Sequence, residues 1–544
     1  MIAVATARPD SWIVNATGPE PDLTRSASPL VQQLFADGYV TAGPLRMGWA
    51  TTADGQLCDS LGNPVPGLWT LGCTRKGELL ESTAVPEIRA QAAALATSIV
   101  DSAASAHRTR MVPATAADHG LTRPQPRPTR RDRYGLPLLA NARAVEHFDE
   151  AVARVLRIQD GARIALDAAI AEDPTFALAH AARALLAFEG VIDADASSGL
   201  AAAEHAALTH ADARTSSFLY AVTNRIRRGD AAGLLAHIND FPRDALVVNA
   251  CIPTIAFSGA TDVPQQAWSI VEKLAPVYGS DWWYMGLLAF VRQEQHRWAQ
   301  SAALADRALA ADPAAGHAVH ARSHVYYETG EHDAGLKWLD AWIQGPGANA
   351  FHRAHYAWHA ALHELALERR ADVWTRFRVQ LAPPSVTGVR ALVDSASLLW
   401  RCHLFGVWPL PLPIGDVIGA VPDHLLREPP TGFIAMHAAL ALAAAGDQAR
   451  LQALRHYAVG RPEPVFDLIV ALVGALSAYI AGDYAFAAIA ITRRSGEWDR
   501  LGGSDAQREV IDDTLLSALM HAGLCHTARD LMQIRTDTPA RLPG

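Results

Sequence analysis

Apolar positions recur every three or four residues through most of the chain after residue 134, which is the spacing of amphipathic helices. The expected helices come in pairs, and short Gly-Asp or Asp-Pro turns rather than strands separate them. Around Pro313 and Gly330, a helix, a turn, a second helix and a closing proline follow one another with a period of about 34 residues. This order is typical of repeated helical hairpins.

Three further stretches repeat this order, and in each of them small residues stand where two helices must approach closely. They lie at residues 165–186, 437–447 and 475–491. Because each helix pair has an apolar face that it cannot bury alone, neighbouring pairs are expected to stack. We therefore predict a mainly α fold over residues 134–544, a tetratricopeptide-like α-solenoid of helical hairpins whose first helices line a concave side.

The first hundred residues have a different pattern, with short apolar runs that end at glycines. Residues 11–16 and 67–71 have the character of buried strands, turn signals lie between them, and an alanine-rich helix is expected over residues 85–100. We predict a small α/β fragment over residues 1–102. A basic, proline-rich linker with seven arginines is expected to follow over residues 103–133.

Composition and charge argue against several classes of protein. The net charge is -9, so no overall positive field attracts nucleic acid or an anionic membrane, and we expect neither as a partner. The five cysteines are far apart and indicate neither a disulfide scaffold nor a zinc-ribbon motif. The N-terminus lacks the pattern of a secretory signal, and the longest uncharged stretch, residues 468–482, is too short to cross a bilayer. We therefore expect a cytoplasmic protein in which residues 468–482 form a buried helix.

The stretches WIVNATGPEPD (residues 12–22) and GLWTLGCTRKGELLESTAVPEIRAQAAALA (residues 67–96) resemble the C-terminal end of FAD/NAD(P)-binding proteins. The positions that this resemblance matches to residues beside the cofactor are Ala16, Thr17, Gly18 and Gly72. The G-x-G-x-x-G turn that contacts the pyrophosphate in such proteins occurs nowhere in the 544 residues. We therefore expect no FAD binding, and we interpret residues 12 to about 100 as an inactive remnant of a flavoprotein.

Several stretches of the helical region together indicate a family. They are DRYGLPLLANARAVEHFDEAV (132–152), YGSDWWYMGLLAF (278–290), HAVHARSHVYYETGEHDAGLKWLDAWI (317–343), HRAHYAWHAALHELAL (352–367), LVDSASLLWR (392–401), MHAALALAAAGD (436–447) and LGGSDAQREVIDDTLL (501–516). On these stretches, residues 132–540 are similar to the tetratricopeptide repeat protein 38 family. That family has no well-established activity, so the resemblance implies a fold rather than a function. The chain departs from the family pattern at Asp505, where Asn, His or Arg is expected.

Histidines are the most distinctive candidates for chemistry, since the chain has 22 of them and many fall in the middle of the helical region. Two trios of residues stand at i, i+4 and i+8: His320, His324 and Glu328, and His355, His359 and His363. At about 100° per residue, each trio drifts by only about 80° and stays on one helical face. The trios are expected on the first helices of neighbouring repeats, about 10 Å apart. We therefore predict two rows of side chains that face each other across a concave groove.

Three interpretations of these rows remain open. In the first, the histidines are packing residues of the helical interior, and neighbouring carbonyl groups satisfy their ring nitrogens. In the second, the groove binds a peptide or an acidic small molecule, helped by Arg390 or Arg401. The residues expected to contact that ligand are His320, His324, Tyr327, His355, Trp358, His359 and His437.

In the third interpretation the groove is catalytic. Two imidazoles at i, i+4 of one helix and one imidazole of the neighbouring helix hold Zn²⁺ or a similar ion, with Glu328 or Glu364 as general base. Acid-base catalysis by the histidines without a metal is another form of this interpretation. The candidate metal ligands are His320, His324, His355 and His359, and the candidate catalytic residues are these four together with Glu328.

From these patterns we expect a scaffold or binding protein whose groove, lined by histidines and aromatic side chains, takes a peptide or a small molecule. A histidine-dependent enzyme that acts in the same groove, with or without a metal, is the alternative. No cofactor is expected, although the histidine pattern is compatible with a transition metal.

Overall fold

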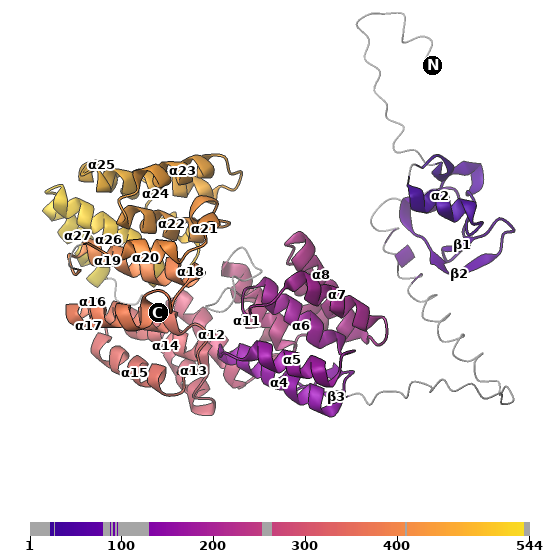
Figure 1. The fold of residues 1–544 in the computed structure, drawn as a ribbon, viewed down its shortest axis with the longest axis horizontal. Helices are drawn as coiled ribbons and strands as arrows, with labels where there is room; N and C mark the ends of the chain where they lie inside the picture. The colour runs from indigo at the N-terminus through magenta and orange to yellow at the C-terminus, as the bar shows by residue number, and fades with distance from the viewer. Residues whose placement is uncertain are drawn as a thin grey trace, which may run out of the picture. The chain divides into compact units, whose positions relative to one another are not determined.

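The structure is a computed structural model of the 544-residue chain. It describes residues 22–26 and 28–79, the isolated positions 88, 91, 92 and 95, and residues 130–252, 264–408 and 411–537. The chain divides into two compact units, Met1–Pro124 and Gln125–Gly544, and each is described by itself. In Figure 1 the first unit is indigo, and the second runs from purple to yellow.

A small antiparallel sheet and one helix make up much of the described part of the first unit. The strands are β1 (Gln56–Cys58) and β2 (Pro64–Trp69), and the helix is α2 (Pro29–Ala36). Short 3₁₀ turns are η1 (Leu23–Arg25), η2 (Pro44–Arg46) and η3 (Gly72–Arg75). Val40, Trp49 and Leu57 form the small buried core of this unit.

The sequence predictions for the first unit are tested only in part. The strand predicted over residues 67–71 corresponds to β2, which begins three residues earlier and pairs with β1 in a hairpin. The strand predicted over residues 11–16 lies outside the described residues, and so does most of the helix predicted over residues 85–100. Gly72, one of the positions matched to flavoproteins, has a φ of 75°.

Stacked helical hairpins make up most of the second unit and confirm the predicted mainly α fold (Figure 1). Its first half contains α4 (Ala142–Arg157), α5 (Ala162–Glu172), α6 (Ala177–Phe188), α7 (Ala196–Ala207), α8 (Ala213–Arg228), α9 (Ala232–Asp240), α10 (Ala245–Cys251), α11 (Pro264–Tyr278), α12 (Trp282–Glu294), α13 (Trp298–Ala311), α14 (Gly316–Glu328) and α15 (His332–Gln344). Its second half contains α16 (Arg353–Ala366), α17 (Arg370–Arg376), η4 (Phe377–Leu381), α18 (Gly388–Arg390), η5 (Ala391–Ala396), α19 (Ser397–Leu404), α20 (Ile414–Gly419), α21 (Asp423–Arg427), α22 (Gly432–Ala444), α23 (Gln448–Val459), α24 (Val465–Ile480), α25 (Tyr484–Thr492), η6 (Trp498–Leu501), α26 (Asp505–His521) and α27 (Cys525–Asp537). Segments η4 and η5 are π-helical, and η6 is a 3₁₀ turn.

The packing between helices follows the predicted repeat. Helix α14 begins 34 residues after α12, and α12 packs against both its hairpin partner α13 and the next first helix, α14. The same arrangement recurs for α6, α7 and α8, and for α22, α23 and α24. At the turn between α14 and α15, Gly330 has a φ of 73°, a conformation that residues with a side chain disfavour.

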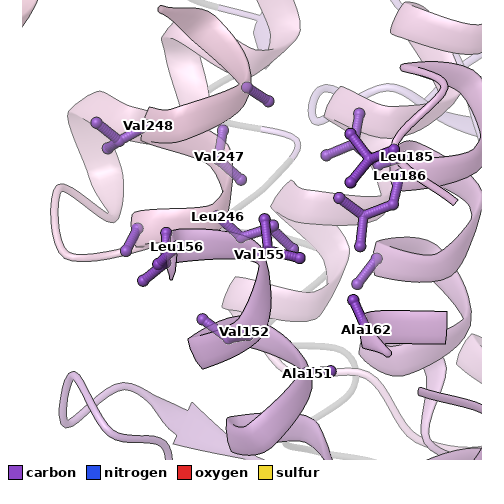
Figure 2. Close-up of a cluster of buried hydrophobic side chains, with 14 of the residues drawn as sticks. Ala151, Val152, Val155, Leu156, Ala162, Leu185, Leu186, Leu246, Val247 and Val248 are labelled. Carbon is purple, nitrogen blue, oxygen red and sulfur yellow. The ribbon is translucent and has the colours of Figure 1, made fainter. Parts of the chain in front are cut away.

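Apolar side chains from consecutive hairpins interlock to form the core. Figure 2 shows one part of it, where side chains of α4, α5, α6 and α10 point toward one another. The labelled residues are Ala151, Val152, Val155, Leu156, Ala162, Leu185, Leu186, Leu246, Val247 and Val248. All of them are buried, so each hairpin covers an apolar face that its neighbour cannot bury alone.

Helix α16 contributes to two large apolar cores of this unit. Tyr356 and Ala360 belong to the core that α4 to α15 also build, whereas Trp358 and Ala361 belong to the core of the later helices. A helix with an apolar core on two sides is buried nearly all round. The polar side chains between residues 355 and 364 of α16 therefore lie in the protein interior.

One further sequence prediction is confirmed at a single element, and the predicted end of the linker at residue 133 is corrected. The buried helix predicted over residues 468–482 is α24, and in the part of the chain that the structure describes no helix is long and apolar enough to cross a membrane. Strand β3 (Arg130–Arg131) pairs with β4 (Pro137–Leu138), so the end of the segment predicted as a linker belongs to a small sheet of the second unit.

Candidate metal centre

Helices α14 and α16 carry the two predicted rows of side chains, and they pack against each other. Glycines allow the neighbouring helices to come close to α14. A Cβ at Gly286 of α12 would lie 2.9 Å from the backbone nitrogen of Ala318, and a Cβ at Gly316 would lie 2.5 Å from the carbonyl oxygen of Arg157. A side chain at either position would therefore push α14 away from its neighbours.

Four imidazoles from these two helices meet in the interior, and we call them the histidine cluster: His320 and His324 of α14, and His355 and His359 of α16. The Nε2 atom of His320 lies 3.1 Å from Nε2 of His324 and 3.1 Å from Nε2 of His355. The ring centroid of His359 is 4.5 Å from that of His324 and 4.7 Å from that of His355. One ligand atom from each of His320, His324 and His359 lies within 4.8 Å of the other two.

The histidine cluster is buried, with each residue between 1% and 4% exposed. The structure thus brings the two predicted rows together, but inside the protein, whereas we expected an open groove. The physical reason is that α16 has apolar cores on two sides, so its polar stripe faces α14 rather than solvent. The last residue of the α16 row, His363, lies apart, with its Nδ1 atom 3.1 Å from Nδ1 of His332.

Hydrogen bonds leave four ring nitrogens of the cluster without a partner among the residues that the structure describes. A neutral imidazole has one N–H donor and one acceptor, so His320 can donate well to only one of the two Nε2 atoms that face it. Among the residues that the structure describes, neither nitrogen of His359 has a hydrogen-bond partner, and Nδ1 of His320 and of His324 has none. A buried polar atom without a partner costs roughly 1–3 kcal/mol. The arrangement therefore favours a cation that several of these nitrogens can bind at once.

One carboxylate supports the cluster from its edge. Asp394, fully buried in η5, accepts a hydrogen bond of 2.8 Å from Nδ1 of His355 and one of 3.3 Å from Nη1 of Arg390. Because the His355 proton lies on Nδ1, its Nε2 atom has a free lone pair that faces His320. Carboxylates commonly orient metal-binding histidines in this way.

Burial keeps the cluster uncharged. Burial first, and then the positive charge that His355 would carry, lower the pKa of His324 to about 3. Burial, followed by the neighbouring histidines, also holds the pKa of His320 and of His359 well below the usual value. Burial lowers the pKa of His355 as well, although the negative charge of Asp394 opposes the change. The four imidazoles are therefore neutral near pH 7, which is the state that binds metal ions.

Aromatic rings pack on two members of the cluster. Phe290 of α12 stacks on His320 with 5.3 Å between ring centroids, and Trp358 stacks on His355 at the same distance. These contacts restrict the orientation of both imidazoles, and they surround the cluster with apolar rather than polar groups.

The predicted residues at the end of α14 form a separate acidic region. The hydroxyl of Tyr327 donates a hydrogen bond of 2.6 Å to Glu509 of α26. Glu328 is half-buried, and burial together with the negative charges of Glu509 and Asp505 raises its pKa to about 8. Asp505, where the chain departs from the family pattern, pairs with His296 at 3.1 Å. None of these side chains is among the three that converge as metal ligands.

Two other predicted residues have partners of their own. Nδ1 of His437 donates a hydrogen bond of 2.9 Å to the carbonyl oxygen of Phe433. Glu364 accepts one of 2.6 Å from the guanidinium of Arg376, so it does not face the cluster as a general base.

Asp394 is the member of the centre that sequence reasoning missed. It lies 39 residues after His355 and in a different element, so no local spacing links the two. The signal that could have shown it is a single acidic residue inside the apolar run LVDSASLLW, residues 392–400. A carboxylate in such a run must find a partner when the run is buried.

Comparison with known proteins assigns no function. No protein family model matches the chain, and no curated protein matches it.

Proposed function

We propose that the second unit is a metal-binding scaffold in which His320, His324 and His359 hold one transition-metal ion of the zinc class. The observation that carries this proposal is the convergence of three neutral, buried imidazoles from two neighbouring hairpins, with ligand atoms within 4.8 Å of one another. The bound ion joins α14 to α16. In this proposal the chain is a cytoplasmic scaffold of the tetratricopeptide repeat protein 38 kind.

The spacing of the ring nitrogens supports a metal. A zinc–nitrogen bond is about 2.0–2.1 Å, so two ligand atoms on a tetrahedral ion stand about 3.3 Å apart. The Nε2 atoms of His320 and His324 are 3.1 Å apart. These residues are one helical turn apart on α14, which is why both reach the same point, and His359 reaches it from the facing helix.

The type of ligand narrows the choice of ion. Three imidazole nitrogens suit zinc, copper, nickel or cobalt, whereas calcium and magnesium prefer oxygen ligands. The acidic side chains of this unit, such as Glu328, stand outside the group of three. The proposed ligand set is therefore selective for transition metals.

The other interpretations have less support at the same residues. A groove that binds a peptide needs exposed histidines and aromatic side chains, but Trp358 is fully buried and the cluster is at most 4% exposed. Packing alone leaves both nitrogens of His359 without a partner in the described part of the chain. A metal-dependent enzyme would require a coordination position that a substrate can reach, which the burial of all four imidazoles disfavours.

Metal analysis of the full-length protein tests the proposal. After incubation with Zn²⁺ and desalting, the wild type is expected to retain one equivalent of zinc, and the His359→Ala variant is expected to lose most of it. His437→Ala is the matched control, because His437 is equally buried and lies outside the cluster. A wild type without zinc, or a His359→Ala variant that retains the full equivalent, would contradict the proposal.

A further inference from the structure

We infer that His355 is the fourth ligand of this metal and that Asp394 positions it, so that the site is closed and its role is structural. This inference rests on the proposed function, but it concerns how the ion is held rather than whether it binds. His355 is added as a ligand and Asp394 as a positioning residue. As a consequence, the ion has no coordination position that water or an added ligand can occupy.

The first argument is the tautomer of His355. Its Nδ1–H group is donated to Asp394 over 2.8 Å, so the remaining lone pair is on Nε2. That atom faces Nε2 of His320 at 3.1 Å, the same spacing that separates His320 from His324. His355 therefore already presents a metal-ligating atom at the distance of an adjacent ligand.

The second argument is the place of His355 in the cluster. Its ring centroid lies 5.0 Å from that of His320 and 4.7 Å from that of His359, so it borders two of the three proposed ligands. His355 lies outside the group of three whose ligand atoms are all within 4.8 Å of one another, although its Nε2 atom is 3.1 Å from that of His320. Binding must therefore draw its Nε2 atom a short way inward while Nδ1 stays on Asp394.

The third argument is burial. His324 and His359 are each 1% exposed, His355 is 3% exposed, and Trp358 stacks on the His355 ring. Catalytic zinc sites keep one position for water or substrate, whereas structural sites use four protein ligands. In this apolar interior a fourth imidazole is a better ligand than a water molecule that would itself need hydrogen-bond partners.

The fourth argument is the element that carries Asp394. Residues Ala391–Ala396 form a π-helical segment between α18 and α19. π-Helical segments are uncommon and often accompany functional sites, because they realign the side chains of one helical turn. Here the π-helical turn carries the carboxylate that holds His355, and Arg390 one turn earlier pairs with the same carboxylate at 3.3 Å.

Cobalt substitution tests the inference on the full-length protein. Co²⁺ replaces zinc at nitrogen sites, and its visible absorption reports both the coordination number and the entry of an added anion such as azide. The wild-type Co²⁺ form is expected to show the intense absorption of a four-coordinate ion and to be unchanged by azide. The His355→Ala variant is expected to bind Co²⁺ more weakly and to change its spectrum when azide is added, since one position is then open.

Asp394→Asn separates positioning from coordination. This variant is expected to weaken Co²⁺ binding by about 10–100-fold, the usual effect of changing a residue that orients a ligand, and to remain unaffected by azide. An Asp394→Asn variant that binds Co²⁺ as tightly as the wild type would contradict the positioning role of Asp394.

The outcomes distinguish this inference from the proposed function. If wild-type protein binds Co²⁺ and its spectrum shifts with azide, the site is open and the inference is wrong, while the proposed function stands. If wild-type protein binds no Co²⁺, both are wrong. Both results come from the wild type alone, so they do not depend on whether a variant folds.

Discussion

Buried histidines in this protein differ in their partners more than in their burial. His437 and His359 are both almost fully buried, yet Nδ1 of His437 bonds a backbone carbonyl, whereas neither nitrogen of His359 has a partner in the described part of the chain. In the described part of the chain the first arrangement leaves only Nε2 of His437 without a partner, whereas the second leaves both nitrogens of His359 without one. The surroundings of each ring, rather than the residue type, are therefore the basis for proposing which histidines bind a metal.

Glu328 gives a prediction about pH at the same scale. Burial first, and then the charges of Glu509 and Asp505, raise its pKa from the ordinary value of 4.5 to about 8. The folded protein thus holds this proton more tightly than the unfolded chain. Its contribution to stability is fully present below pH 4.5 and is lost as the pH rises to about 8.

The Glu328→Gln variant should lose this dependence. In metal-free protein, the free energy of unfolding of the wild type is expected to fall by about 1 kcal/mol or more beyond that of the variant between pH 5 and pH 8. Urea unfolding at several pH values measures this difference. Glu331→Gln, at an exposed position three residues later, is the control and should follow the wild type. Parallel profiles for wild type and Glu328→Gln would show that Glu328 does not hold a raised pKa.

At the scale of single residues, local spacing was enough to predict which histidines share a helical face. His320 and His324, like His355 and His359, stand at i and i+4, so their positions on common helical faces were predictable. The contact between His355 and Asp394 was not, because it joins residues 39 positions apart through a π-helical segment that ordinary helical periodicity does not anticipate.

Among the elements, close helix contacts depend on particular glycines. Gly286 is buried against α14, where a Cβ would lie 2.9 Å from the backbone nitrogen of Ala318. Gly474 in the interior of α24 has open space where its Cβ would stand. Both residues are glycines inside a helix, so the sequence does not distinguish them. They differ only in how closely a neighbouring helix packs against them.

This contrast predicts effects of opposite sign. Gly286→Ala should destabilise the protein by about 1–3 kcal/mol, because the added methyl group meets backbone that cannot move aside easily. Gly474→Ala should stabilise it by about 0.5–1 kcal/mol, because alanine loses less conformational entropy in a helix. Chemical denaturation of the two variants beside the wild type measures both. Equal effects of the two substitutions would contradict the close approach of α12 to α14.

Helices and turns were predictable where the residues that specify them are close together in the sequence. The repeat period, the turn at Gly330 and the buried helix α24 follow from apolar spacing and turn residues, and all three appear in the structure. The pairing of β2 was less predictable. Its apolar run indicated a strand, but its start and its antiparallel partner β1 depend on contacts that no local pattern specifies.

In the helical unit as a whole, the proposed metal lies where two apolar cores meet. Helix α16 contributes Tyr356 to one core and Trp358 to the other, and its imidazoles face α14. An ion that joins α14 and α16 therefore ties together the earlier and later hairpins. Because unfolding of the unit would disrupt these ligands, binding is coupled to global stability.

Metal binding by the histidine cluster is tested most directly by thermal unfolding of the full-length protein with and without zinc, combined with measurement of its metal content. Free Zn²⁺ at 100 times the dissociation constant should stabilise the fold by about 2.7 kcal/mol, which for a unit of this size raises the Tm by about 3 °C. The wild type is expected to bind one equivalent of zinc and to show a Tm that falls back when a chelator removes the ion, with no such change in His359→Ala. An unchanged Tm and no retained zinc in the wild type would contradict the central claim that the histidine cluster is a metal site.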